Sequence, residues 1–226
     1  MHKQKQALIF WGGWDGHEPE RVSNRFAGVL RGEGFAVELL QGTQDLPGPG
    51  RLAELDLLVP VCSMGELPKA HSENIVRAVG EGLGLAGFHG GMCDAFRNDT
   101  QWQFMTGGQW VAHPGNDGVE YRVHIHKGSS PLVEGIEDFT LRSEHYYLHY
   151  DPAVEVLAST RFPLVDGFHA ANKPVDMPVA WTKYWGAGRV YYCSLGHVDA
   201  VFEQSPAAQE LLRRGMLWAA RANSYK

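Results

Sequence analysis

The stretch GLAGFHGGMCDAF, residues 84–96, predicts the architecture of the chain. Its apolar start is typical of a buried strand, the glycines around His89 are typical of a tight turn, and the following residues suggest a helix. This glycine spacing resembles a nucleophile elbow, in which a strained turn lifts one side chain above a sheet. Enzymes of acyl transfer place serine or cysteine there. Histidine instead favours acid/base chemistry or metal ligation, although a structural role at a helix N-terminus explains it as well.

Strands and helices alternate through the first half of the chain. Apolar runs at residues 7–14, 35–40, 56–62 and 84–89 indicate strands, and residues 18–35 and 68–82 show helical periodicity with glycines at their ends. Segments at 119–128, 139–150, 154–160, 178–186 and 189–197 indicate further strands, and 205–221 a final helix. We therefore expect one α/β domain over residues 1–226: a three-layer αβα sandwich with a mostly parallel sheet and an antiparallel extension between about 119 and 195.

Composition excludes several classes of protein. The 226 residues carry a net charge of −6, and their lysines and arginines are scattered, which argues against nucleic acid or an anionic membrane as the partner. No apolar run is long enough for a membrane helix, and the start of the chain suggests a first strand rather than a signal peptide. Three cysteines without a CxxC pair argue against a disulfide framework or a zinc knuckle, so we expect a cytoplasmic protein.

Histidines follow several of the expected strands. His17 comes after the first strand, His89 after the fourth and His197 after the last, while Cys62 ends the third. The carboxyl ends of parallel strands meet at one edge of a sheet, which is where ligands bind in this architecture. We therefore expect these side chains to share one rim.

A carboxylate and a phenol lie close together in the segment SEHYY. Glu144 and Tyr146 share one side of an expected strand and His145 faces the other, because side chains alternate along a strand. An acid beside a phenol suits proton transfer next to a carbonyl, although a solvated strand face explains the pair equally well. We predict His89, His17 and Glu144 as catalytic residues.

The same residue types could hold a metal ion. A divalent cation such as zinc could take its ligands from four residues on separate loops, namely His17, His89, Glu144 and His197. No HExxH motif marks this set. Aromatic rings beside polar groups suit the apolar face and hydroxyl edge of a sugar. The predicted substrate-binding residues are Trp14, Trp102, His113, Tyr146 and His197.

A set of ordered motifs resembles the ThuA-like (trehalose utilisation) family, within the class I glutamine amidotransferase-like superfamily. The motifs are GLAGFHGG (84–91), VAHPG (111–115), LRSEHYY (141–147), PVAWTKYWGAGRVYYCSLGH (178–197) and LLRRGMLWAA (211–220). The resemblance implies a flavodoxin-like sandwich without the amidotransferase cysteine and a place in sugar catabolism. It also implies a 3-keto-disaccharide as substrate class and a sugar oxidoreductase as pathway partner.

Two classes of function remain open. The first is an enzyme, a keto-sugar isomerase or a lyase or hydrolase rather than a glutamine amidotransferase, that uses histidine and carboxylate acid/base chemistry. The second is a non-catalytic sugar-binding or regulatory protein on the same scaffold. An exposed sheet edge would allow a homodimer, which nothing in the sequence requires.

Overall fold

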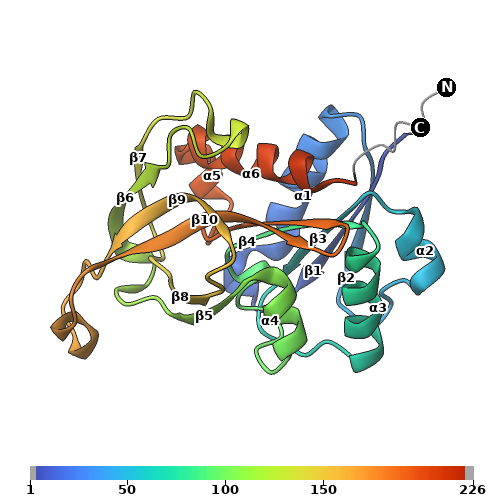
Figure 1. Ribbon diagram of the computed structural model, residues 1–226, viewed down its shortest axis with the longest axis horizontal. Coiled ribbons are helices and arrows are strands. Elements are labelled where there is room, and N and C mark those ends of the chain that lie inside the picture. The colour runs from blue at the N-terminus through green and yellow to red at the C-terminus, as the bar shows by residue number, and fades with distance from the viewer. Residues whose placement is uncertain (1–3, 222–226) are drawn as a thin grey trace.

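The computed structural model describes residues 4–221, and its helices and strands alternate along the chain (Figure 1). The strands are β1 (Gln6–Gly12), β2 (Ala36–Gln41), β3 (Leu57–Cys62), β4 (Gly84–Phe88), β5 (Gly108–Ala112), β6 (Val119–Ile125), β7 (Phe139–Ser143), β8 (Tyr147–Tyr150), β9 (Glu155–Phe162), β10 (Val175–Trp185) and β11 (Gly188–Cys193). The helices are α1 (Pro19–Gly32), α2 (Pro49–Glu54), α3 (Lys69–Gly80), α4 (Thr100–Thr106), α5 (Ala200–Gln204) and α6 (Pro206–Ala219). Short 3-10 turns include η1 (Asp15–His17) and η2 (His89–Gly91).

A nine-stranded sheet forms the middle layer, in the order β2-β1-β3-β4-β11-β10-β9-β6-β7. The five strands from β2 to β11 pair in parallel, and the four strands from β10 to β7 pair antiparallel. Strands β5 and β8 form a separate antiparallel pair. The predicted mixed α/β fold, with a mostly parallel sheet and an antiparallel extension, is confirmed.

Helices cover both faces of the parallel part (Figure 1). Helices α1 and α6 pack on one face, and α2, α3 and α4 lie on the other. The side chains of β1 show why both faces need cover: Ala7 and Ile9 join one apolar core, and Leu8 and Phe10 join the other. Strands that are apolar on both sides cannot leave either face to water.

The stretch that predicted the fold is only partly as expected. Strand β4 and the turn at His89 are present, but the helix predicted directly after them is wrong. One 3-10 turn ends at Gly91, and the chain then runs beside the loop after β3, where backbone hydrogen bonds join Met64 to Asp94 and Phe96. These bonds compete with helix formation, so a helix begins only at Thr100.

Four elements had no clear signal in the sequence: α2, α4, α5 and β5. Each has at most seven residues, too few to establish a periodic pattern. Within residues 4–221 no helix has the length and hydropathy needed to cross a membrane.

Candidate functional site

Three histidines meet at the carboxyl ends of the parallel strands. His17 lies in η1 after β1, His89 begins η2 after β4, and His197 follows β11. The ring centroids of His17 and His89 are 4.9 Å apart, and that of His197 lies 5.2 Å from the first and 5.5 Å from the second. The structure therefore brings these predicted residues together, as the strand order requires.

Glu144 enters this group from the loop between β7 and β8. Its carboxylate oxygen Oε2 lies 3.0 Å from Nε2 of His89 and 3.4 Å from Nδ1 of His197, while Oε1 lies 3.7 Å from Nε2 of His113. The two short contacts lack hydrogen-bond geometry, and Oε2 finds no other hydrogen-bond partner among residues 4–221. Glu144 is buried, with 5% of its surface exposed, and its carboxylate lies against the imidazoles of His89 and His197.

The four residues form one cluster of potential ligand atoms. One atom from each of His17, His89, Glu144 and His197 lies within 4.8 Å of all the others. The atoms come from four separate segments of the chain, so tertiary folding alone brings them together. This is the set predicted from the sequence as able to hold a divalent cation.

The backbone at His89 explains how its ring reaches the cluster. His89 has a φ of 47°, in the left-handed region that side chains other than glycine rarely adopt. The following Gly90 is needed because a Cβ there would lie 2.8 Å from Cε1 of His17. The turn has the strained character of an elbow, and it presents an imidazole where related architectures present a nucleophile.

Further contacts orient the imidazoles from outside the cluster. Nδ1 of His89 donates to the carbonyl oxygen of Ser194 at 2.9 Å, and Nδ1 of His17 lies 2.9 Å from the hydroxyl of Ser63. The ring of Tyr146 stacks on that of His89 at 4.3 Å. The bond to Ser194 leaves Nε2 of His89 beside Oε2 of Glu144, and the bond to Ser63 leaves Nε2 of His17 free of that contact.

Burial controls the protonation of these groups. Burial, together with the neighbouring imidazoles of His89 and His197, lowers the pKa of His17 to about 3. Burial likewise lowers the pKa of His89, against the opposing effect of Glu144. Burial also acts on Glu144, where it would raise the pKa, but contacts with His197 and His89 outweigh it and hold the pKa below the usual range. The cluster thus combines a carboxylate with two imidazoles, those of His17 and His89, whose lowered pKa favours the neutral form that offers a lone pair.

An open cavity of about 410 Å³ lies over the cluster. Its lining comprises Trp14, His17, Met64, Asp94, Arg97, Trp110, His113, Asn116, Asp117, Glu144, Tyr146 and His197. Four of the predicted substrate-binding residues therefore border it: Trp14, His113, Tyr146 and His197. His89 does not line this cavity, since its ring lies behind Glu144 and Tyr146 with 1% of the residue exposed.

Trp102 is a wrong prediction for the substrate site. Its side chain is fully buried in α4, where Nε1 donates to the carbonyl of Met92 at 2.9 Å and the ring packs edge-on to Phe96. Trp102 was predicted to bind substrate because the short helix α4, which buries its side chain, had no clear signal in the sequence. The tryptophan at the cavity besides Trp14 is Trp110.

The ion pair of Asp94 and Arg97 on the cavity wall was not predicted from the sequence. Asp94 accepts from Nε of Arg97 at 2.6 Å, and the guanidinium of Arg97 lies 4.4 Å from the centre of the Trp110 ring. Burial raises the pKa of the Asp94 carboxyl, and Arg97 partly offsets that effect. Their segment was interpreted as a helix, so nothing in the sequence indicated that both side chains face a cavity.

The alternation predicted for Glu144, His145 and Tyr146 is present, although these residues form a loop rather than a strand. Glu144 and Tyr146 face the cavity, and His145 faces the other way, against Tyr121 and Phe162 at ring distances of 4.7 and 5.4 Å. His145 is as buried as His89 and is not part of the cluster. It therefore offers a matched comparison for the histidines of the site.

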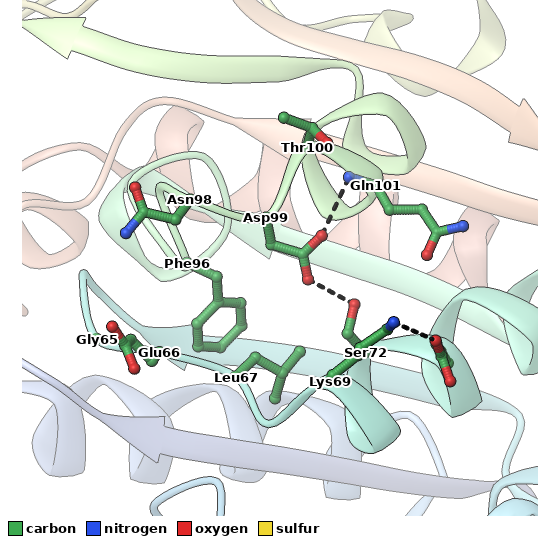
Figure 2. A pocket seen from close by; sticks show the side chains of 11 residues that line it. Gly65, Glu66, Leu67, Lys69, Ser72, Phe96, Asn98, Asp99, Thr100 and Gln101 are labelled. Carbon is green, nitrogen blue, oxygen red and sulfur yellow. Dashed lines mark hydrogen bonds and ion pairs between the residues drawn. The ribbon is translucent and has the colours of Figure 1, made fainter.

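A second cavity of about 320 Å³ lies between the start of α3 and the start of α4 (Figure 2). Here the polar side chains bond to one another: Ser72 donates to Asp99 at 2.5 Å, and Asp99 also accepts from the backbone nitrogen atoms of Gln101 and Trp102. Lys69 pairs with Glu73 at the rim. Asp99 is thereby engaged as the N-cap of α4.

Comparison with protein families identifies the relatives of this chain. The family model for ThuA, described as trehalose utilisation, matches residues 6–219. The chain belongs to the ThuA family. This membership indicates a role in trehalose utilisation or sugar metabolism. A comparison with curated protein sequences gave no match.

Solved structures share the fold. A ThuA-like protein from Bacteroides uniformis is 20% identical, with a TM-score of 0.76 over 97% of this chain and 93% of that one. A ThuA-like protein from Parabacteroides merdae is 18% identical, with a TM-score of 0.71 over 99% and 93%. A Salmonella typhimurium protein described as cytoplasmic is 12% identical, with a TM-score of 0.65 over 96% and 100%. At such identities the likeness concerns the fold of this ThuA-family chain.

Proposed function

We propose that this ThuA-family protein is an enzyme of sugar catabolism that acts on a keto-sugar, in particular a 3-keto-disaccharide of the trehalose type. One observation carries the proposal: a buried carboxylate, Glu144, lies among imidazoles at the floor of an open cavity. Side chains that can accept and donate protons, held beside the place of the substrate, are what proton abstraction next to a carbonyl requires.

The cavity walls suit a sugar. Its volume of about 410 Å³ is in the usual range for small-molecule sites, about 300–1,000 Å³. Trp14, which is 49% exposed, and Trp110 offer flat apolar faces to a pyranose ring. Asp94, Asn116 and Asp117 lie on the same wall and can bond sugar hydroxyls.

The reaction follows from the acidity of a carbon beside a ketone. A base removes the proton at C2 of the 3-keto ring, and the electron pair of that bond forms an enolate. Isomerisation follows if the proton returns elsewhere. Elimination follows if the C1–O bond to the second sugar breaks and the departing oxygen takes a proton. Neither route consumes an oxidant or reductant.

His113 is the best placed base for this step. Its side chain is 28% exposed, it lines the cavity, and its Nε2 lies 3.7 Å from Oε1 of Glu144. Glu144 and His17, two of the three residues predicted to be catalytic, also line the cavity. His89 lies behind Glu144 and does not line the cavity, so we assign it a role that acts through Glu144 rather than on the substrate directly.

The substrate implies a partner and a compartment. A 3-keto-disaccharide arises by oxidation of a secondary hydroxyl, so a sugar oxidoreductase must supply it. We place both steps in the cytoplasm, in line with the description of the Salmonella typhimurium structural relatives as cytoplasmic. The exposed edge of the sheet at β7 offers a surface for a homodimer.

The test is to incubate the purified protein with 3-keto-trehalose in D₂O and to follow the sugar by NMR. The proposal expects deuterium at the carbon beside the carbonyl and a new product. A matched incubation with trehalose, which has no ketone, should show neither. Binding of the keto-sugar without exchange or product would contradict the enzyme and favour a sugar-binding or regulatory protein.

A further inference from the structure

We infer that His17, His89, Glu144 and His197 bind a divalent transition-metal cation, with zinc as the first candidate. The inference deepens the proposed function, since a cation at this place would polarise the ketone oxygen of the substrate. It rests on how the four ligand atoms face one another, which is independent of any substrate.

His89 carries its ring hydrogen on Nδ1. The carbonyl oxygen of Ser194 can only accept, so Nδ1 of His89 carries the hydrogen in their 2.9 Å bond. The opposite atom, Nε2, then presents a lone pair to Oε2 of Glu144 at 3.0 Å. Two acceptors this close repel each other unless an electropositive group lies between or beside them.

The same pattern recurs at His197. Its Nδ1 lies 3.4 Å from the same carboxylate oxygen, also without hydrogen-bond geometry. Within the described part of the chain, Nε2 of His89, Nδ1 of His197 and Oε2 of Glu144 are all buried and lack a hydrogen-bond partner. Buried polar atoms are rarely left so, and three of them converge here.

The spacing fits a zinc ion. Ligands held at 2.0–2.1 Å from a tetrahedral zinc ion lie about 3.3 Å from one another. The two measured contacts of Glu144, 3.0 and 3.4 Å, bracket that value. The widest separation in the set is at most 4.8 Å, so that pair would close by up to about 1.5 Å on binding, which small side-chain rotations can supply.

The surroundings also match a metal site. Ligating histidines commonly bond their second nitrogen to a carbonyl or another polar group, which fixes the ring and its tautomer. Ser194 does this for His89 and Ser63 does it for His17. Imidazole-rich sets select zinc and its neighbours over magnesium.

The test uses the full chain, stripped by chelator and without an affinity tag, titrated with Zn²⁺, Mn²⁺ and Mg²⁺ in a calorimeter. We expect one equivalent of Zn²⁺ to bind and Mg²⁺ not to bind. Glu144→Gln and His197→Ala should each weaken zinc binding by about 100-fold or more, and Ser63→Ala by about tenfold. His145→Gln, a matched change of a buried histidine outside the set, should leave the affinity within about twofold.

Circular dichroism and thermal melting check that each variant is folded. If a variant of a ligand residue does not fold, Ser63→Ala still tests the inference, because Ser63 contacts His17 without being a proposed ligand. Absence of zinc binding by the wild type would overturn the inference. So would binding that survives in Glu144→Gln and His197→Ala, which would place the ion elsewhere. Zinc binding without turnover would leave this inference standing and overturn the proposed enzyme. Turnover by the stripped protein, together with no zinc binding, would overturn this inference and leave the proposed enzyme standing.

Discussion

The cavity at Glu144 and the cavity at Asp99 border the same two segments, and their polar groups differ in hydrogen bonding. The segments 64–66 and 94–99 contribute different residues to each of the two. In the smaller cavity, Asp99 is satisfied by Ser72 and by the backbone of α4 (Figure 2). In the larger one, Glu144 and His197 bring buried atoms together that have no hydrogen-bond partner in the described chain.

This difference indicates which of the two cavities is built to bind a ligand. A buried donor or acceptor without a partner costs about 1–3 kcal/mol, and a charged one costs more. Buried polar atoms without partners lower the stability of the free protein. Proteins keep several of them together mainly at functional sites, where a bound ligand supplies the missing partner. The cluster at Glu144 meets this description and the cavity at Asp99 does not, although their volumes are similar.

A single buried histidine is not enough. His145 also has an unsatisfied Nε2 within the described residues, yet it lies alone between Tyr121 and Phe162. Burial lowers its pKa to about 4, so it is a neutral ring in an aromatic slot. Convergence of several such atoms, together with an open cavity, distinguishes a site.

The largest expected effect is that of Glu144→Gln on turnover of the keto-sugar. The amide keeps the shape but removes the charge that faces His89 and His197. We expect kcat to fall by about 1,000-fold, the scale of losing one preorganised electrostatic group. Steady-state kinetics by NMR measure it, with His145→Gln as the control. A variant with more than a tenth of the wild-type rate would break the distinction between the two cavities.

His113→Ala comes next. His113 borders the cavity but is outside the set of four ligand atoms. We expect kcat to fall by about 100-fold, the lower range for a general base, while zinc affinity stays unchanged. Parallel kinetics and calorimetry separate the two readouts. Loss of both together would mean that His113 belongs to the cluster itself.

A smaller kinetic effect is expected for Arg97→Ala. The guanidinium bonds Asp94 and lies over the ring of Trp110, so its removal loosens the wall that contacts the sugar. We expect KM to rise by about tenfold, or about 1.4 kcal/mol of binding, with kcat changed by less than threefold. An unchanged KM would exclude this wall from substrate recognition.

Asp199→Asn tests a buried carboxylate that is satisfied. Hydrogen bonding to Arg25 holds the pKa of Asp199 below its ordinary value, so its stabilisation is present above the unfolded pKa of about 3.9 and is lost as the pH falls through the folded value. At pH 7 we expect a loss of about 1.5–3 kcal/mol in urea unfolding. The difference from wild type should shrink below about pH 4. A difference independent of pH would contradict this origin.

The smallest effect concerns the second cavity. Asp99→Asn weakens the charged N-cap of α4 and the bond from Ser72, for an expected loss of about 1 kcal/mol in unfolding free energy. Turnover and zinc affinity should stay within about twofold of wild type. A large kinetic loss in this variant would show that the two cavities act together.

The sequence predicted the parts of this picture that follow from local pattern and strand order. Apolar runs bounded by glycines indicated the strands, and the convergence of parallel strand ends placed His17, His89 and His197 at one rim. Alternation along SEHYY predicted that Glu144 and Tyr146 face the same way, and the structure shows that both face the cavity. Their residue types indicated proton transfer or metal ligation before any distance was known.

Other parts depend on contacts between distant segments. Backbone bonds from Met64 to the 94–96 segment prevent the expected helix and turn Asp94 and Arg97 toward the cavity. No local pattern encodes that pairing. Trp102 was wrong for a related reason, because the seven-residue helix α4 buries its ring entirely. The closeness of Glu144 to His89, 55 positions earlier in the numbering, likewise follows only from the folding of the antiparallel extension.

The most direct test of the central claim is anomalous diffraction from crystals grown with zinc, recorded on both sides of the zinc absorption edge. We predict one strong anomalous peak within bonding distance, about 2.0–2.2 Å, of Nε2 of His89, Oε2 of Glu144 and Nδ1 of His197. A peak only at surface residues, or density that shows these three atoms unchanged and without an ion, would contradict the account.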